Sequence, residues 1–238
     1  MSNSRVIVAL DFPDVATARQ HISMLEPGLC RVKVGMELFT SGGPALIESL
    51  VSAGFEVFLD LKIHDIPTTV AKACTAAARL GVWMVNVHAG GGRQMLQAAT
   101  AAVAGEPRRP LLIGVTVLTS LASPDMADIG VHADVEAQVT RLAGLCKSAG
   151  LDGVVCSAQE AGRLQSELGR EFILVTPGIR PAWSARHDQK RTMTPTAAIL
   201  AGSHYLVIGR PIFQAGDPVR MLHQLNGEID AALARRQI

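Results

Sequence analysis

The chain has 238 residues, of which 48% are hydrophobic and 18% are charged, a composition typical of a folded globular protein. Its 22 Lys and Arg residues almost balance its 21 Asp and Glu residues, so the net charge of +1 argues against nucleic acid or an anionic membrane surface as a partner. The length suits one domain over residues 1–238.

The cysteines and the apolar runs predict where the protein works. The four cysteines are widely spaced and form no CxxC pair, which argues against a zinc site or a redox dithiol. The apolar runs Val6–Leu10 and Leu111–Leu118 are too short for a secretory signal or for a membrane span of about 20 residues. We therefore expect a cytoplasmic protein with reduced thiols and no membrane contact.

Short runs rich in Val, Ile and Leu recur along the chain and predict buried strands, because continuous apolar runs are typical of sheets covered on both faces. In chain order, the predicted strands are Val6–Leu10, Arg31–Val34, Val57–Leu61, Met84–Val87, Leu111–Val117, Gly153–Cys156, Phe172–Val175 and Tyr205–Ile208.

Stretches of helical length, rich in Ala and Leu, separate these runs. The predicted helices are Val15–Leu25, Pro44–Ala53, Thr68–Leu80, Gly92–Ala104, Asp134–Ala149, Ala158–Leu168, Thr196–Ala201 and Val219–Arg235. Four of them end before a glycine that suits a left-handed cap, namely Gly54, Gly81, Gly150 and Gly202. The alternation predicts a single-domain α/β fold, a (β/α)8 TIM barrel, with a doubly wound open sheet as the alternative.

Polar residues gather where the predicted strands end. They are Asp11, Lys33, Asp60, Lys62, His88, Thr119, Ser157, Thr176, Gly209 and Arg210. In a barrel the carboxyl ends of the strands share one face, and barrel enzymes build their active sites there. The sequence therefore predicts an active site at this face.

The third predicted strand carries the chemistry. Side chains two apart on a strand share a face, so Asp60 and Lys62 should both point into the mouth of the barrel. Lys33 from the preceding strand and Asp65 from the following loop would extend them into a row of alternating charge. Flanking carboxylates favour the ammonium form of Lys62 and suit it to act as a proton donor. The alternative is an ion-pair network that only joins two strands, although burial of charge is a weak source of stability.

The seventh and eighth predicted strands end in Pro177-Gly178-Ile-Arg180 and Gly209-Arg210. Loops at these positions often bind phosphate through backbone N–H groups and a helix N-terminus, and an arginine adds a forked donor. Taken singly, each motif could be a tight turn with a solvated arginine. Together they predict a phosphate site.

Three further features have two readings each. The long polar loop Arg180–Thr194 could close over the phosphate with Gln189 reaching back, or could be an ordinary solvated loop. Thr119 and Ser120 could hydrogen-bond a planar ring or could form a turn. For His88 we favour a structural role, because no second ligand stands at metal-binding spacing.

Residues 60–67 read Asp-Leu-Lys-Ile-His-Asp-Ile-Pro and resemble the DxKxxDIP signature of the orotidine 5′-phosphate decarboxylase family, its bacterial members above all. Matching blocks extend over essentially the whole chain in the family's order. The resemblance implies a cytoplasmic homodimeric barrel that converts orotidine 5′-phosphate to uridine 5′-phosphate (UMP) and CO2 in the last step of de novo UMP synthesis. It implies neither a metal nor another cofactor.

The resemblance also implies roles for single residues. Lys62 would donate a proton to C6 of the pyrimidine, and Asp60 would stress the substrate carboxylate, with Lys33 and Asp65 completing the catalytic group. Asp65 and Thr69 would reach the neighbouring subunit's site. The implied substrate contacts are Asp11 and Lys33 at the ribose, Thr119 and Ser120 at the base, Gln189 between base and phosphate, and Arg180, Gly209 and Arg210 at the phosphate, with Ile66 and Pro177 in the same site.

Three other functions compete with this one. A related barrel with the same strand motif could use Mg²⁺ and an enediolate, and a Schiff-base aldolase could use Lys62 as its nucleophile. Flanking acids argue against the aldolase, because a nucleophilic amine must lose its proton. A catalytically silent phosphate-binding barrel is the third.

Overall fold

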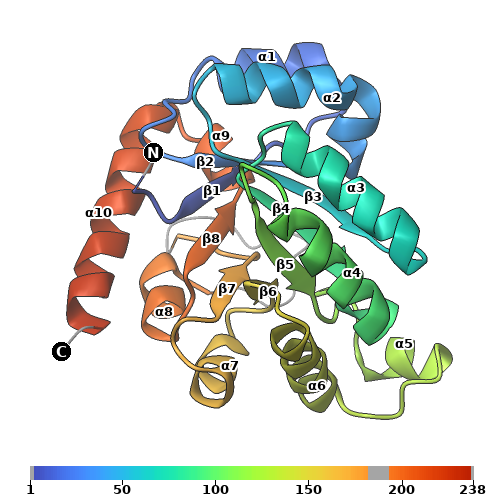
Figure 1. Cartoon of the computed structure of the whole chain (residues 1–238). Coiled ribbons are helices and arrows are strands. Elements are labelled where there is room, and N and C mark those ends of the chain that lie inside the picture. Colours follow the sequence, from blue (N-terminus) through green and yellow to red (C-terminus); the bar gives the residue numbers. More distant parts are fainter. Residues whose placement is uncertain (1–2, 182–192, 237–238) are drawn as a thin grey trace.

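The computed structural model describes residues 3–181 and 193–236. In this part of the chain, eight parallel strands form one closed barrel in sequence order, surrounded by helices (Figure 1). The strands are β1 Val6–Ala9, β2 Arg31–Gly35, β3 Val57–Ile63, β4 Met84–His88, β5 Leu111–Val115, β6 Gly153–Val155, β7 Ile173–Thr176 and β8 Tyr205–Ile208. The predicted TIM barrel is confirmed, and the open sheet is excluded because β1 pairs with β8.

All the predicted helices are present, and their ends differ from the prediction by at most three residues except at the start of α2. The helices are α1 Val15–Ile22, α2 Met36–Ser52, α3 Pro67–Arg79, α4 Gly92–Ala104, α5 Ser123–Asp128, α6 Val135–Ser148, α7 Ala161–Leu168, α8 Pro195–Leu200, α9 Arg210–Phe213 and α10 Pro218–Arg236, with the 3-10 turn η1 Ala89–Gly91. The short helices α5 and α9 were not predicted, because four to six residues carry too little periodicity.

Helix α2 begins eight residues earlier than the predicted Pro44. Gly43 has a positive φ of 59° and joins two helical segments across a kink, with Pro44 opening the second segment. Proline is well placed in the first turn of a helix, so the sequence marked the second start correctly and missed the segment before it. The predicted glycine caps are confirmed, since Gly54, Gly81, Gly150 and Gly202 all have positive φ.

The barrel interior is packed with apolar side chains, so it is a core and not a pore. Ile7, Phe58, Met84, Ile113 and Val175 are each at most 1% exposed and form one cluster. A larger cluster fills the layer between the strands and the helices. The functional face therefore lies above a closed core, at the carboxyl ends of the strands.

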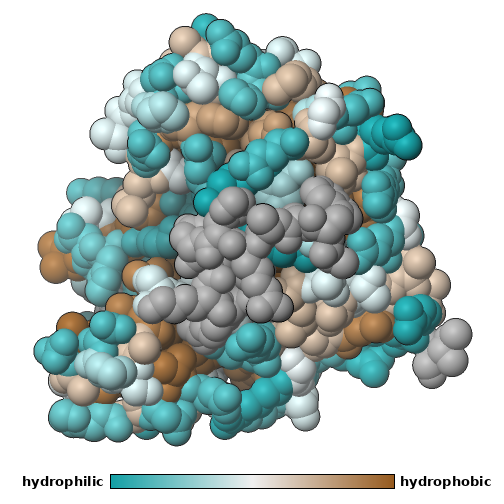
Figure 2. Space-filling model, turned by 180° about the vertical axis from the view of Figure 1, so that it is seen from behind, coloured by the Kyte–Doolittle hydropathy of each residue, from teal (hydrophilic) through white to brown (hydrophobic). Residues whose placement is uncertain are grey.

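The face of the molecule opposite to the view of Figure 1 is rich in polar residues. Figure 2 shows hydrophilic residues over much of the face seen from behind, with smaller hydrophobic areas between them. Within the described residues, no helix is long and apolar enough to cross a membrane. All four cysteines are buried and free.

Candidate active site

A cavity of about 620 Å³ opens at the carboxyl ends of the strands. Most of the predicted site residues line it: Asp11, Lys33, Asp60, Lys62, Thr119, Pro177, Arg180, Gly209 and Arg210. They come from strands and loops spread along the whole chain, and closure of the barrel brings them together. Polar groups from distant parts of the sequence thus converge on one hollow.

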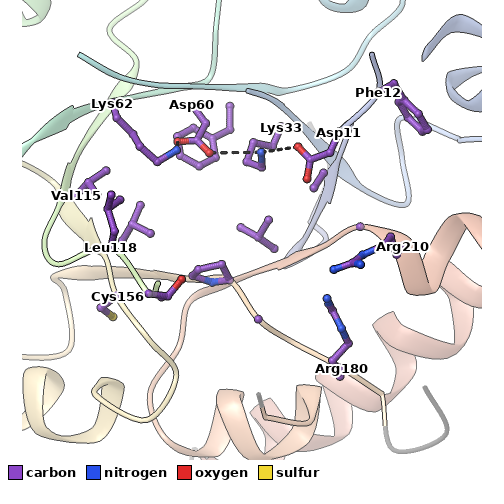
Figure 3. Close-up of a pocket in the computed structure, with 18 of the residues that line it drawn as sticks. Asp11, Phe12, Lys33, Asp60, Lys62, Val115, Leu118, Cys156, Arg180 and Arg210 are labelled. Carbon is purple, nitrogen blue, oxygen red and sulfur yellow. Dashed lines mark hydrogen bonds and ion pairs between the residues drawn. The ribbon is translucent and has the colours of Figure 1, made fainter. Parts of the chain in front are cut away.

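One side of the cavity carries four charged residues of alternating sign, which we call the charged row: Asp11, Lys33, Asp60 and Lys62 (Figure 3). Lys33 Nζ lies 3.1 Å from Asp11 Oδ1 and 3.4 Å from Asp60 Oδ2. Lys62 Nζ lies 2.7 Å from Asp60 Oδ1. The Lys33 and Asp60 side chains are only 11% and 12% exposed, whereas that of Lys62 is 30% exposed. Lys62 is therefore the more accessible cation.

The charged row keeps its inner members ionised. Burial alone would raise the pKa of Asp60, but Lys33 and Lys62, with hydrogen bonds from Lys62 and Asn86, outweigh it and hold that pKa below its usual value. Burial would likewise lower the pKa of Lys33, but Asp60 and Asp11 outweigh it and raise that pKa. A carboxylate and an ammonium group are thus fixed side by side at neutral pH.

The backbone at Lys62 differs from the regular strand that we expected. Lys62 has a φ of 51°, in the left-handed region that residues other than glycine seldom adopt. The pairing of β3 with β4 also shifts between Leu59 and Ile63. Simple alternation was therefore an incomplete reason for placing Asp60 and Lys62 together, although both do line the cavity.

Asp65 does not join the charged row within one chain. It is exposed, and its Oδ1 accepts a hydrogen bond from the Ile66 N–H at 2.6 Å. Ile66 is 65% exposed and Thr69 is exposed too. The fourth member of the row is Asp11, which the charge pattern along the sequence did not pair with Lys33.

The other side of the cavity carries two arginines. Figure 3 shows Arg180 and Arg210 with their head groups pointing toward one another, across the cavity from the charged row. Arg180 is 9% exposed, and its Nη1 donates to the Ile179 carbonyl at 2.9 Å. Arg210 begins the short helix α9, directly after Gly209. Arginine, glycine and a helix start occur together, as expected for an anion site.

The other predicted site residues are Ser120 and Gln189. Ser120 is exposed and lies beside Thr119, which lines the cavity. Gln189 and most of the loop Arg180–Thr194 lie outside the described residues. The ends of this loop meet, because the Arg180 N–H donates to the Met193 carbonyl at 2.9 Å.

Sequence reasoning missed an aromatic group at the cavity. Phe12 stacks on His21 with ring centroids 4.3 Å apart and meets Phe213 edge-on at 5.1 Å, and all three residues line the cavity. The one signal in the sequence was the position of Phe12, which directly follows the predicted site residue Asp11. The His21 Nδ1 lies 2.9 Å from the Thr17 carbonyl, which fixes the orientation of the ring.

His88 contacts the turn that follows it and the ring of His64. Its Nδ1 accepts the Gly90 N–H at 3.1 Å, and its ring stacks on His64 with centroids 5.4 Å apart. Burial, His64 and Lys62 lower the pKa of His88. Among residues 3–181 and 193–236, no three His, Cys, Asp or Glu side chains lie together as a metal site.

Comparison with known proteins gives a family and close relatives. The model of the orotidine 5′-phosphate decarboxylase / HUMPS family matches residues 4–225. The orotidine 5′-phosphate decarboxylase of Chromobacterium violaceum is 59% identical over 99% of this chain and 95% of that protein. The enzyme of the same name from Hydrogenovibrio crunogenus is 58% identical over 94% of this chain and 95% of that protein.

Solved structures agree with these sequence matches. The crystal structure of orotidine 5′-phosphate decarboxylase from Lactobacillus acidophilus superposes with a TM-score of 0.86 at 39% identity, covering 94% of this chain and 98% of that one. An uncharacterized conserved protein from Geobacillus kaustophilus superposes with a TM-score of 0.80 at 40% identity, covering 94% of this chain and 99% of that one.

Proposed function

The chain belongs to the orotidine 5′-phosphate decarboxylase / HUMPS family, and we therefore propose that it is a carboxy-lyase that converts orotidine 5′-phosphate to UMP and CO2. This is the last step of de novo UMP synthesis. The observation that carries the proposal is the charged row on one side of a cavity that has Arg180 and Arg210 on the other. That arrangement suits a substrate with a carboxylate at one end and a phosphate at the other.

The chemistry needs a proton donor and a fixed negative charge. As the bond from C6 to the carboxyl group breaks, its electron pair stays on C6 and CO2 leaves. Lys62 Nζ then gives a proton to C6, and the resulting amine regains a proton from solvent. The ion pair with Asp60 at 2.7 Å supports this role, because it holds the ammonium group of Lys62 at a fixed place.

Asp60 acts on the ground state. Its lowered pKa keeps it ionised, so a substrate carboxylate beside it is repelled until that charge leaves as neutral CO2. An interaction that is worse in the ground state than in the transition state accelerates the reaction. The protein supplies this repulsion through a carboxylate that Lys33 and Lys62 stabilise.

The remaining predicted contacts divide by position in the cavity. Asp11 and Lys33 bind the ribose hydroxyls, and Thr119 and Ser120 face the pyrimidine. Arg180, Gly209 and Arg210 surround the phosphate, Gln189 bridges base and phosphate, and Pro177 and Ile66 complete the site. Support comes from the lining of the cavity by seven of these: Asp11, Lys33, Thr119, Pro177, Arg180, Gly209 and Arg210.

The direct test is turnover without added metal. Purified protein mixed with orotidine 5′-phosphate and EDTA should remove the orotate absorbance and release CO2 and UMP in equal amounts. Loss of activity in EDTA would favour the Mg²⁺-enediolate barrel. Covalent trapping of substrate on Lys62 by borohydride would favour the aldolase, and no turnover at all would favour a silent binding barrel.

We also propose a cytoplasmic homodimer in which Asp65 and Thr69 contribute to the partner's site. The exposure of Asp65 and Ile66 after β3, and of Thr69 in the first turn of α3, supports this, because these residues are available to a second chain. Each site of a two-fold dimer would then combine Lys62 of one chain with Asp65 of the other.

A mixing experiment tests the shared site. Lys62→Ala and Asp65→Ala homodimers should each be inactive. Co-expressed with separable tags, the two chains should form heterodimers in which one site carries both changes and the other is intact, so the purified heterodimer should regain about half of wild-type activity per dimer. If the purified heterodimer stays inactive, the site is not shared.

A further inference from the structure

The edge between β3 and β4 is irregular where the reactive residues lie. Leu59 pairs with Val85, and Ile63 pairs with Val87. Residues 60–62 of β3 therefore stand opposite a single residue of β4, Asn86. Extra residues on one of two paired strands break the ladder of backbone hydrogen bonds and redirect side chains. Something other than regular pairing must hold Asp60 and Lys62.

The Asn86 side chain hydrogen-bonds to both Lys62 and Asp60. Its Oδ1 accepts the Lys62 backbone N–H at 2.8 Å, and its Nδ2 donates to Asp60 Oδ1 at 2.6 Å. Asn86 is 0% exposed. An N–H group only donates and a carboxylate only accepts, so both contacts together need one acceptor and one donor side by side, as in an amide.

The contact with Lys62 is made where the backbone is strained. The φ of 51° at Lys62 is rare for a residue with a side chain, and such conformations persist when surrounding contacts hold them. Asn86 bonds to the N–H of this same residue. It also bonds to the Asp60 oxygen that Lys62 Nζ contacts. One buried amide therefore fixes both ends of the Asp60–Lys62 pair.

We propose that Asn86 is a positioning residue for the decarboxylation: its amide holds the Lys62 backbone in the left-handed turn and aims the Asp60 carboxylate, so that the two groups face the reacting carbon as a fixed pair. This inference rests on the proposed function. Asn86 is not among the residues that line the cavity, so it acts through Asp60 and Lys62 and not on the substrate.

Asn86 should also affect the pH profile. Asp60 is faced by Lys33 from β2, by Lys62 from its own strand and by Asn86 from β4, while Asp11 from the end of β1 and His88 from β4 act on the lysines. Each of the three direct neighbours of Asp60 favours its ionised form. Loss of the amide donor should therefore move the acid limb of kcat to higher pH. A purely structural role would lower stability without moving that limb.

The test compares Asn86→Ala and Asn86→Asp with a matched control, Thr116→Val. Thr116 is also 0% exposed and also bonds a neighbouring strand, with Oγ1 donating to the Val155 carbonyl at 3.0 Å. We expect kcat of Asn86→Ala to fall by about 100-fold, as for a displaced reacting group. The affinity for UMP should stay close to wild type, since the arginines are untouched. Thr116→Val should keep its kcat and pH profile.

Asn86→Asp separates positioning from folding, because it has the shape of asparagine and keeps the acceptor for the Lys62 N–H. Its carboxyl group must hold a proton to donate to Asp60, so its kcat should recover as the pH is lowered, opposite to Asn86→Ala. This variant carries the test if Asn86→Ala does not fold. An unchanged kcat, or a loss with the wild-type pH profile, would overturn the proposal. Absence of wild-type turnover would instead refute the proposed function itself.

Discussion

The two ends of the barrel carry similar ion pairs in different surroundings. Arg31 and Lys33 lie two residues apart on β2, while Glu56 directly precedes β3 and Asp60 lies at the middle of that strand. At the upper end, where the strands have their carboxyl ends, Lys33 pairs with Asp60 beside the cavity. At the lower end, Arg31 Nη2 pairs with Glu56 Oε2 at 3.0 Å. Phe58 lies between the two pairs along β3, in the apolar core.

The coverings of the two pairs differ. The Arg31 guanidinium lies 4.4 Å from the Trp83 ring centroid and 5.1 Å from that of Tyr205, and Arg31 is 6% exposed. Among the described residues, neither Lys33 nor Lys62 makes a cation–π contact, and the pair of Lys33 and Asp60 is continued by Asp11 and Lys62 at the cavity. Closed pairs of this kind fix structure, whereas charges held beside a cavity can act on a ligand. The lower pair should therefore affect stability and the upper row should affect turnover.

The largest effect should come from Lys62→Ala. Loss of a proton donor costs about 10²–10⁴-fold, and we expect the upper part of this range or more because Lys62 is the only predicted donor. Circular dichroism should show an intact fold. Lys147→Ala is a matched control, because Lys147 on α6 is exposed, donates to the Leu168 carbonyl and lies outside the cavity lining. Retained turnover in Lys62→Ala would remove the proposed mechanism.

Arg31→Met should lower the stability of the fold and leave turnover almost unchanged, the opposite of Lys62→Ala. It leaves Glu56 without its buried cation, and breaking such a pair typically costs about 3–5 kcal/mol of unfolding free energy. Turnover per folded molecule should be close to wild type, because Arg31 does not line the cavity. Urea unfolding and kcat on the same samples provide the measurement. The double variant Arg31→Met, Glu56→Gln should regain part of the stability, and a fall in kcat without loss of stability would reverse the comparison.

Arg210→Ala tests the side of the cavity opposite the charged row. Hydrogen bonds to charged groups contribute about 1.5–3 kcal/mol, so kcat/KM for orotidine 5′-phosphate should fall by about 10- to 100-fold. The affinity for a ligand without phosphate, such as uridine, should not change. Arg163→Ala is the control, because Arg163 pairs with Glu136 and Glu167 at the surface. Equal losses for uridine and UMP would mean that Arg210 does not contact phosphate.

The sequence predicted the barrel and most of the polar residues that the structure brings to the cavity, and what it missed has a physical cause. Apolar runs and terminal glycines are local signals, and the strand ends that they mark place Lys33, Asp60 and Arg210 correctly. The left-handed backbone at Lys62 and the Asn86 contacts depend on a register shift between two strands, which alternation along one strand does not encode. The role proposed for Asp65 needs a second chain, which the sequence of one chain does not place.

The smallest effect is a pH-dependent stability difference between wild type and Asp60→Asn. The pKa of Asp60 is below its usual 3.8 in the folded protein, despite burial, because Lys33 and Lys62 favour the ionised form. A lowered folded pKa gives stability that is complete above the unfolded pKa and is lost as the pH falls through the folded value. The difference in unfolding free energy should therefore be constant between about pH 5 and 7 and shrink below about pH 4.

Lys33→Met gives the mirror image of this prediction. Asp60 and Asp11 raise the pKa of Lys33 above its usual 10.5, so its contribution is complete below that pH and is lost as the pH rises through the folded value. Urea unfolding from pH 3 to pH 11 measures both the loss of the Asp60 contribution at low pH and the loss of the Lys33 contribution at high pH. Because the two variants remove opposite charges from one row, they should lose their difference from wild type at opposite ends of the pH range. If neither variant differs from wild type in unfolding free energy at any pH, the row contributes to binding and chemistry but not to folding.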